Sequence, residues 1–159
     1  MQNLWVKIIV CVLLCTGLGF LSGLVTSGQI NDWYSSIQKP SWNPPNWIFG
    51  PVWTTLYILM GIAAALIWHS GHQKKNMALR YFVFQFFLNL LWSFIFFGLH
   101  QPGAAFAEII LLLVMIALTV TSFFSIHKTA GLLLLPYILW VSFATVLNGT
   151  IWWLNKAGS

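Results

Sequence analysis

Side chains that could bind a small molecule recur at helical spacing in an apolar stretch near the middle of the chain. They are Gln85, Asn89, Trp92, Ser93 and Phe96. On a helix this spacing puts two amides, a hydroxyl and two rings on one face. Because polar groups that face lipid are costly, we expect this face to point into a helix bundle. There it could line a ligand pocket or make hydrogen bonds between helices, and the spacing alone favours neither.

Two other apolar stretches repeat this combination of rings, small residues and a hydrogen-bonding group. The first stripe is Trp53, Tyr57, Met60, Gly61 and Ala64, and the second is Trp140, Phe143, Ala144, Leu147, Asn148 and Trp152. Aromatic stripes are more often core than binding site. However, Trp53 and Trp140 lie well inside their stretches, away from the interfacial positions that tryptophan usually takes. Three such faces turned toward one another would enclose an aromatic cavity suited to a flat apolar ligand.

The acidic residues are too few for conventional catalysis. Asp32 and Glu108 are the only two acids, and no Ser-His-Asp set, P-loop or GxGxxG motif accompanies them. Glu108 lies about one turn into an apolar stretch, which makes it a functional candidate by default. The helix macrodipole also favours a carboxylate near a helix N-terminus, and we prefer this structural interpretation. Asp32 is interpreted as a loop or helix-cap residue.

The histidines and cysteines do not predict a metal site. His69 and His72 lie beside a lysine-rich turn, and without further ligands nearby they are interpreted as solvated loop residues. Cys11 and Cys15 fall on one apolar helix, where a disulfide is geometrically poor, and are interpreted as small apolar residues.

The composition indicates that a membrane surrounds these stretches. Of the 159 residues, 59% are hydrophobic and 6% are charged, and the mean hydropathy is +0.84. A soluble domain carries about 25% charged residues, whereas in lipid apolar side chains can face outward. The net charge is +5, but the seven bases are scattered among loops. This pattern is typical of membrane orientation, and we expect no nucleic-acid partner.

The predicted fold is all-α: a polytopic membrane protein with a bundle of five transmembrane helices in a single domain, residues 1–159. The spans are expected at about residues 5–25, 47–68, 79–99, 104–126 and 130–154, each long enough to cross about 30 Å of hydrocarbon. Residues 27–46 contain three prolines and should form a long ordered loop with at most a short helix. The other links are short, so we expect successive helices to pack antiparallel.

The distribution of bases predicts the orientation. With five spans, one side of the membrane collects Lys7, Lys74, Lys75, Arg80 and Lys128, and the other collects Lys39 and Lys156. The positive-inside rule then places the N-terminus inside and the C-terminus and the long loop outside. We expect the membrane to be the cytoplasmic membrane of a bacterium.

Four blocks of the sequence resemble a known family. They are WYSSIQKPSWNPP (Trp33–Pro45), PVWTTLYILMG (Pro51–Gly61), QFFLNLLWSFIFFG (Gln85–Gly98) and PYILWVSFATVLNGTIWWLN (Pro136–Asn155). Together they cover most of the chain, and they resemble the TspO/MBR family of translocator and tryptophan-rich sensory proteins, which includes the peripheral-type benzodiazepine receptor. The resemblance implies five transmembrane helices, often dimeric, around a pocket that the first loop closes.

The resemblance also implies ligands. Family members bind porphyrins such as protoporphyrin IX, and many bind isoquinoline-carboxamide or benzodiazepine compounds, so the expected partners are these small molecules, the bilayer and a second copy of the chain. Porphyrin would be ligand or substrate, and no cofactor is required. By motif match and helix face, the predicted ligand-binding residues are Tyr34, Pro44, Trp53, Tyr57, Asn89, Trp92, Trp140, Ala144 and Asn148.

Three functions are compatible with these residues. The leading hypothesis is a porphyrin receptor or carrier in tetrapyrrole transport or stress signalling. The alternative is a light-dependent enzyme that degrades protoporphyrin, because Trp53 and Trp140 match the tryptophans tied to that activity in the family. The third is a structural or sensory module that acts through a protein partner, supported only by the pairs Gly19/Gly23 and Gly103/Ala107.

One segment departs from the family. Mammalian members carry a sterol-binding pattern with tyrosine and arginine at the end of the fifth helix. Gly149 and Trp153 occupy those positions here, so the pattern that would imply sterol binding is absent from this segment.

Overall fold

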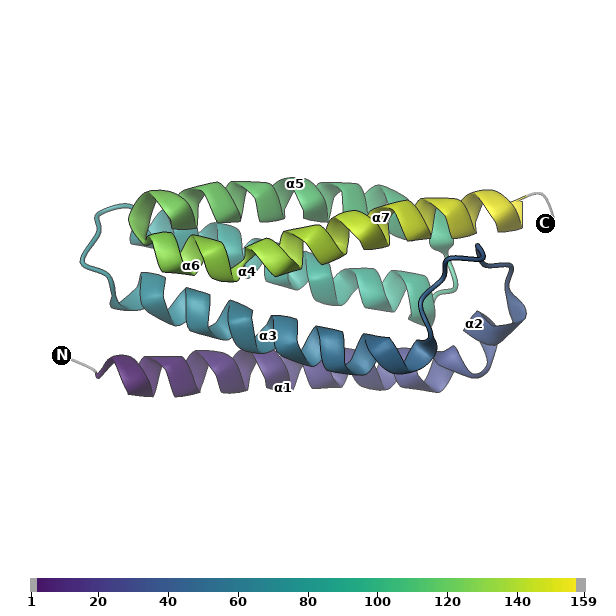
Figure 1. The fold of residues 1–159 in the computed structure, drawn as a ribbon, viewed down its shortest axis with the longest axis horizontal. Helices are drawn as coiled ribbons and strands as arrows, with labels where there is room; N and C mark the ends of the chain where they lie inside the picture. Colours follow the sequence, from purple (N-terminus) through teal and green to yellow (C-terminus); the bar gives the residue numbers. More distant parts are fainter. Residues whose placement is uncertain (1–2, 157–159) are drawn as a thin grey trace.

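The chain folds into an elongated bundle of helices (Figure 1). A computed structural model describes residues 3–156. The elements are α1 (Leu4–Ile30), α2 (Trp33–Ser36), α3 (Asn46–His69), α4 (Lys75–Ser93), η1 (Phe94–Gly98), α5 (Pro102–Ile126), α6 (Lys128–Leu133) and α7 (Leu135–Asn155). Five helical segments are long and apolar enough to cross a membrane, namely α1, α3, α4 with η1, α5, and α6 with α7. The prediction of an all-α, five-span membrane protein is confirmed.

The long helices lie side by side, and the two chain ends point to opposite ends of the bundle (Figure 1). Helix α1 packs on α3, α4 on α5, and α5 on α7. Away from its ends and its prolines, such a helix pairs its backbone N–H and C=O groups along its own axis, which is the condition for crossing hydrocarbon. The short helix α2 lies at the same end of the bundle as the C-terminal end of α7.

Polar side chains are buried in the bundle, and apolar ones cover its outside. Gln85, Asn89 and Asn148 are at most 2% exposed, which confirms that the polar face of α4 points inward. In contrast, Leu13, Val83 and Leu139 are 65 to 70% exposed. This inverted pattern is the one that lipid permits and water does not.

The first helix is longer than the sequence predicted. It continues past Val25 to Ile30, so the predicted loop over residues 27–46 begins instead at Asn31. Polar residues do not by themselves end a helix, since their groups can bond locally. Ser27 illustrates this, because its hydroxyl donates to the Leu24 carbonyl at 3.2 Å. The short helix expected in this segment is α2.

Two helical segments contain an irregular turn. In the third span, α4 is followed directly by the π-helical turn η1, which the Leu99 N–H closes on the Phe94 carbonyl at 2.9 Å. In the last span, α6 ends at Leu133 and α7 begins at Leu135. Pro136 has no N–H to donate to the preceding turn, which explains the interruption.

Candidate ligand-binding cavity

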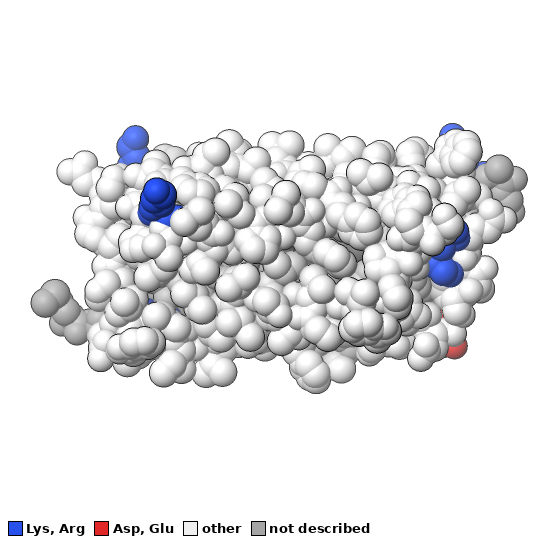
Figure 2. All heavy atoms as spheres, in the orientation of Figure 1, with Lys and Arg blue, Asp and Glu red and all other residues white. Residues whose placement is uncertain are grey.

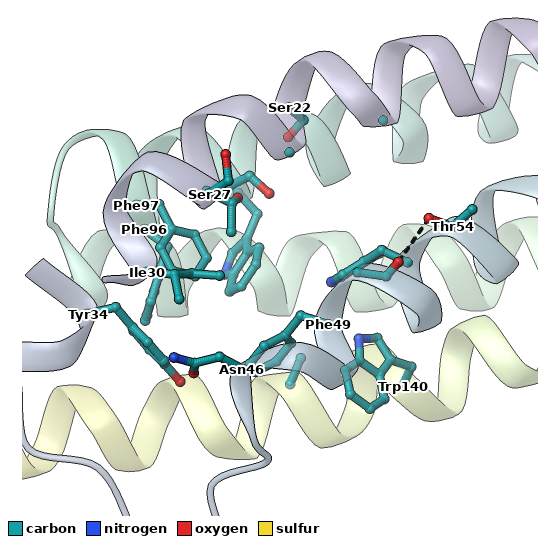
Figure 3. A pocket seen from close by; sticks show the side chains of 18 of the residues that line it. Ser22, Ser27, Ile30, Tyr34, Asn46, Phe49, Thr54, Phe96, Phe97 and Trp140 are labelled. Atoms are coloured by element: carbon teal, nitrogen blue, oxygen red, sulfur yellow. Dashed lines mark hydrogen bonds between the residues drawn. The ribbon is translucent and has the colours of Figure 1, made fainter. Parts of the chain in front are cut away.

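A cavity of about 350 Å³ lies inside the bundle toward the α2 end. This volume is within the range of small-molecule sites. Its walls come from α1, α3, α7 and the end of α4 with η1, while Tyr34 of α2 reaches it from outside the spans. Figure 3 shows Phe49 and Trp140 together at one part of the cavity and Ile30, Phe96 and Phe97 at another, near Tyr34.

Stacked rings form the α3 and α7 walls. Trp53 lies nearly parallel to Tyr57, with ring centroids 5.6 Å apart and an interplanar angle of 28°. Trp140 meets Phe143 at 5.5 Å and Phe49 edge-on at 6.2 Å. Such offset and edge-to-face pairs hold each other in place. The two tryptophans therefore present fixed, flat, apolar surfaces to whatever occupies the cavity.

The indole of Trp92 is held by hydrogen bonds that link three helices. Its Nε1–H donates to Asn148 Oδ1 at 2.9 Å, and Asn148 Nδ2 donates to the Pro102 carbonyl at 2.8 Å. Asn148 thus accepts from the indole of α4 and donates to the first carbonyl of α5, and so ties α7 to both helices. The Trp92 ring also stacks on Phe96 at 5.2 Å, so its orientation is fixed from both sides.

Behind the Tyr57 ring lies a buried network of hydrogen bonds. Tyr57 Oη donates to Asn89 Oδ1 at 2.9 Å, and Asn89 Nδ2 donates to Tyr137 Oη at 3.1 Å. Tyr137 Oη in turn donates to Gln85 Oε1 at 2.7 Å. The amides of α4 are therefore used between helices, and Tyr57 separates them from the cavity.

The segment formed by α2 and the loop that follows it is held together by its own hydrogen bonds. Tyr34 Oη donates to Asn43 Oδ1 at 2.8 Å, and Lys39 Nζ donates to the Ile37 carbonyl at 2.9 Å. Burial raises the pKa of Tyr34 to about 12, against the opposing effect of the Asn43 hydrogen bond. Tyr34 is therefore neutral at physiological pH and remains a donor.

A side chain of α7 clamps the same loop. The Gln38 N–H donates to Asn155 Oδ1 at 3.0 Å, and Asn155 Nδ2 donates to the Gln38 carbonyl at 2.9 Å. Trp42 adds an edge-on contact with Phe143 at 5.9 Å. On the other side of the loop, Trp33 stacks on His100 at 4.6 Å. The segment between α1 and α3 is thus an ordered cover over one end of the bundle.

The structure brings most of the predicted ligand-binding residues together. Seven of the nine line the cavity, namely Tyr34, Trp53, Tyr57, Trp92, Trp140, Ala144 and Asn148. Asn89 lies behind Tyr57 in the hydrogen-bond network, and Pro44 lies in the covering loop away from the cavity wall. Their role in binding a ligand remains a prediction.

Helix α1 supplies a wall that the sequence analysis missed. Its inward face combines glycines with hydroxyl residues, and the cavity is lined there by Thr16, Gly19, Phe20, Ser22, Gly23, Leu24, Thr26, Ser27 and Ile30. A Cβ at Gly19 would collide with the Tyr57 ring, whereas Gly23 has open space before it. The run of small and hydroxyl residues at helical spacing is the signal in the sequence for this wall, and the sequence analysis interprets only its two glycines, Gly19 and Gly23, as a packing pair.

The remaining candidates lie apart from the cavity. Glu108 is beyond the first turn of α5, which holds no acid, so the preferred interpretation as a dipole-stabilised carboxylate is wrong, because that effect fades within one turn. Its two carboxyl oxygens are buried without a hydrogen-bond partner. Within residues 3–156, no cluster of His, Cys, Asp or Glu side chains could hold a metal ion.

Together, the fold and the cavity define an integral membrane protein with an internal, aromatic chamber of small-molecule size. The sequence profile of the TspO/MBR family matches residues 11–154. The chain belongs to the TspO/MBR family.

Named relatives cover nearly the whole chain. The tryptophan-rich protein TspO of Chlorobaculum tepidum is 45% identical over 91% of this chain and 93% of its own length. The protein CrtK of Rhodobacter capsulatus is 39% identical over 89% of this chain and 88% of its own length. The translocator protein of Bos taurus is 37% identical over 96% of this chain and 92% of its own length. The similarity therefore includes both a bacterial tryptophan-rich protein and a mammalian translocator protein.

Proposed function

We propose that the cavity binds flat, largely apolar ligands of the porphyrin class and that the protein is their membrane receptor or carrier, in tetrapyrrole transport or stress signalling. The observation that carries this proposal is the set of fixed rings around one chamber: Trp53, Tyr57, Trp92 and Trp140. Flat rings favour a flat aromatic ligand, and the few polar wall groups can orient its substituents. The names of the relatives, translocator protein among them, are consistent with this role.

A titration with protoporphyrin IX tests the proposal. The absorbance and fluorescence of the porphyrin should change saturably on addition of the protein in lipid nanodiscs, and Trp140→Phe should weaken the binding. Trp153→Phe is the matched control, because Trp153 is 65% exposed on the outside of α7 and does not line the cavity. Equal affinities of the two variants, or no saturable change, would contradict the proposal. An isoquinoline-carboxamide compound should compete for the same site.

Photochemical breakdown of a bound porphyrin is the second candidate function. It is favoured by one observation, namely that Trp53 and Trp140 both line the chamber. A porphyrin excited by light would take an electron from a neighbouring indole and pass it to dioxygen, which becomes superoxide. The indole radical cation would then regain an electron from the porphyrin, so that the net change is oxidation of the porphyrin by dioxygen. This chemistry resides in the ligand and needs no acid–base pair from the protein.

Illumination separates the two functions. If the protein is an enzyme, the porphyrin absorbance should fall faster in light and air with the wild-type protein than with the double variant Trp53→Phe, Trp140→Phe. Removing dioxygen should stop the loss. If the porphyrin absorbance falls at the same rate with the wild-type protein, the double variant and Trp153→Phe, the enzymatic function is excluded and only the receptor function is retained.

The orientation and the assembly are part of the same proposal. We place the α2 end outside and the N-terminal end inside the cytoplasmic membrane of a bacterium, because Lys7, Lys74, Lys75, Arg80 and Lys128 lie toward the latter end. We also propose a homodimer. Gly103 of the pair Gly103/Ala107 packs within the chain, since a Cβ there would lie 2.7 Å from Trp152.

A further inference from the structure

The wall of the cavity is interrupted on one side. Some of the lining residues are also exposed at the surface of the bundle, and all of these belong to α1 or α3: Phe20, Gly23, Leu24, Ser27, Asn46, Gly50 and Thr54. The lining residues of α2, α4, η1 and α7 are buried or half-buried. Within residues 3–156, the cavity therefore opens outward between α1 and α3. We call this gap, with the residues just named, the lateral opening.

The residues of the lateral opening form two edges. On α1 they recur at i, i+3, i+4 and i+7 from Phe20 to Ser27, and on α3 at i, i+4 and i+8 from Asn46 to Thr54. Each set is therefore one face of its helix. Eight steps along α3 give the opening a length of about 12 Å. Figure 3 shows Ser27 of α1 on one side of the cavity and Asn46 of α3 across from it.

The positions of glycines explain why the two helices separate here. A Cβ at Gly61 of α3 would lie 2.6 Å from the backbone of α1, and a Cβ at Gly19 of α1 would collide with the Tyr57 ring. Nearer to the α2 end, a Cβ at Gly23 or at Gly50 would meet no atom within 4 Å. The helices are thus in close contact as far as Gly19 and Tyr57, and beyond them they leave a gap.

The edges of the lateral opening suit hydrocarbon. Phe20 and Leu24 are 68 and 52% exposed. The hydroxyls there bond within their own helices, since Thr54 Oγ1 donates to the Gly50 carbonyl at 2.9 Å and Ser27 Oγ to the Leu24 carbonyl at 3.2 Å. Because α1 and α3 are both long and apolar enough to span a membrane, the gap between them faces lipid.

Charged groups are kept away from this region. None of the described residues that line the cavity is Lys, Arg, His, Asp or Glu. On the face shown in Figure 2, the Lys and Arg side chains lie near the two ends of the bundle and none lies across the middle. An apolar molecule dissolved in the bilayer would therefore meet no charged side chain on its way through the lateral opening, and no charge would have to be buried.

The α2 end of the cavity is closed, in contrast. Asn155 of α7 holds the covering loop through two hydrogen bonds to the backbone of Gln38. Tyr34, which lines the cavity at this end, is 2% exposed and donates to Asn43. A ligand that arrives from the water would have to open the covering loop, whereas one that arrives from the bilayer would find a gap already present.

We propose that ligands enter and leave the cavity sideways from the bilayer, through the lateral opening, and that Gly23 and Gly50 keep this route open. The ligand class is then an apolar molecule that partitions into lipid before it binds. This inference rests on the proposed function, because it needs a ligand in the cavity. The occupant of the lateral opening is the bilayer itself, not a second copy of the chain.

Binding rates test the route. Gly23→Leu and Gly50→Leu each place a side chain in the open space at one edge. Association of protoporphyrin IX with the full chain in lipid nanodiscs is followed by stopped-flow fluorescence, and dissociation by displacement with an excess of an isoquinoline-carboxamide compound. Since a barrier on the route slows entry and exit alike, both rate constants should fall about tenfold, equivalent to about 1.4 kcal/mol in the barrier, while Kd stays nearly unchanged.

Gly17→Leu is the matched control for these variants. Gly17 is also on α1 with open space around an added Cβ, but it does not line the cavity, so both rate constants should stay at their wild-type values. Wild-type rates in folded Gly23→Leu and Gly50→Leu would overturn the proposal. A change in only one of the two rate constants would also overturn it, because the leucine would then act on the bound ligand and not on the route.

The rival route through the covered end has its own variant. Asn155→Ala removes the two hydrogen bonds that hold the covering loop. If ligands pass through the lateral opening, the rate constants of Asn155→Ala should equal those of the wild-type protein. If both rate constants rise in Asn155→Ala and do not fall in the two glycine variants, ligands enter at the covered end and the proposal is wrong.

A measurement without ligand separates this proposal from the proposed function. A nitroxide is attached to Thr54→Cys in a chain whose Cys11 and Cys15 are replaced by alanine, and its collisions with dioxygen and with a water-soluble nickel complex are measured by electron paramagnetic resonance. Dioxygen, which concentrates in hydrocarbon, should reach it and the nickel complex should not. Ser41→Cys in the covering loop, which is exposed, should show the opposite preference.

The outcomes of this measurement are distinct. If neither reagent reaches the nitroxide at Thr54, a second copy covers the lateral opening, and if the nickel complex reaches it, the opening faces water. Either result overturns the proposal. If dioxygen reaches it but the wild-type protein binds no protoporphyrin IX, the proposed function fails while the lateral opening to hydrocarbon is confirmed.

Discussion

Tyr137 is the residue on which most of the buried polar network depends. Its hydroxyl accepts from Asn89 and donates to Gln85, so Tyr137→Phe leaves an amide donor and an amide acceptor unpaired at once. We expect a loss of about 1–3 kcal/mol in the free energy of unfolding, because buried polar groups without partners pay their full desolvation cost. Denaturation of the protein in detergent or lipid, followed by circular dichroism, measures this loss.

A second tyrosine provides the control for Tyr137. The hydroxyl of Tyr81 is exposed and contacts only Met77 Sδ, at 3.5 Å, so Tyr81→Phe should change the free energy of unfolding by no more than about 0.5 kcal/mol. Equal losses in the two variants would mean that the network does not contribute to stability.

For single residues, sequence periodicity predicts which face of a helix a side chain lies on, but not whether that side chain reaches the cavity. Asn89 was expected to contact the ligand, and it does face the bundle interior. The ring of Tyr57 lies between it and the cavity, and no pattern in the sequence states how far a side chain from another helix will reach. Tyr137 was missed, although it stands three residues before Trp140 and so on the same face of the last span. Its partners come from α4, which only the packing reveals.

Gly61 allows the backbones of α1 and α3 to approach each other closely. A Cβ at Gly61 would lie 2.6 Å from Val12 Cα of α1, and backbone cannot move aside as a side chain can. Gly61→Ala should therefore separate the two helices and cost about 1–3 kcal/mol of stability. Since α1 and α3 both wall the cavity, porphyrin affinity should fall as well, which the titration described above measures.

Gly17 of α1 serves as the control for Gly61. A Cβ at Gly17 meets no atom within 4 Å, so Gly17→Ala should leave stability and affinity unchanged or slightly raised, since alanine is the better helix former. A loss in Gly17→Ala as large as that in Gly61→Ala would indicate a general effect of removing glycine rather than a close approach of helices.

Asn155 joins α7 to the covering loop through two hydrogen bonds. Asn155→Ala removes both hydrogen bonds to Gln38, and at about 0.5–1.5 kcal/mol each their loss should open the loop about tenfold more often. Hydrogen exchange over residues 37–43, read by mass spectrometry, should accelerate accordingly. Thr150→Ala, which removes an exposed hydroxyl bonded within α7, should not change it. Equal exchange in both variants would show that Asn155 does not hold the loop.

At the element scale, the sequence predicted helices better than their irregularities. Long apolar stretches leave a chain in lipid few alternatives, so the five spans follow from hydropathy alone. The π-turn η1 does not, because Phe94–Gly98 contains no proline and its glycine comes last. It forms where Phe96 and Phe97 must both pack against α2, as their contacts with Tyr34 at 6.2 and 5.6 Å indicate. That requirement arises from tertiary packing.

For the whole molecule, α1 was the main omission. Its residues are mostly exposed on the outside of the bundle, with Trp5, Leu13 and Phe20 each at least 65% exposed. A sequence so apolar is typical of a helix that only anchors a protein in the membrane. Its glycines and hydroxyl residues nevertheless complete the cavity. Small residues leave space in the wall of a cavity, but they are also typical of helices that pack closely. Only the three-dimensional arrangement separates these two uses.

The orientation in the membrane can be tested with single cysteines at the two ends of the bundle. Ser41 and Gln73 are both exposed, the first in the covering loop and the second in the link between α3 and α4. If the bases of that link hold it in the cytoplasm, an impermeant maleimide should label Ser41→Cys in intact cells and Gln73→Cys only after lysis. The native Cys11 and Cys15 lie within α1, so the wild-type chain should stay unlabelled and sets the background. Labelling of Gln73→Cys in intact cells would place the N-terminal end outside and contradict the proposed orientation.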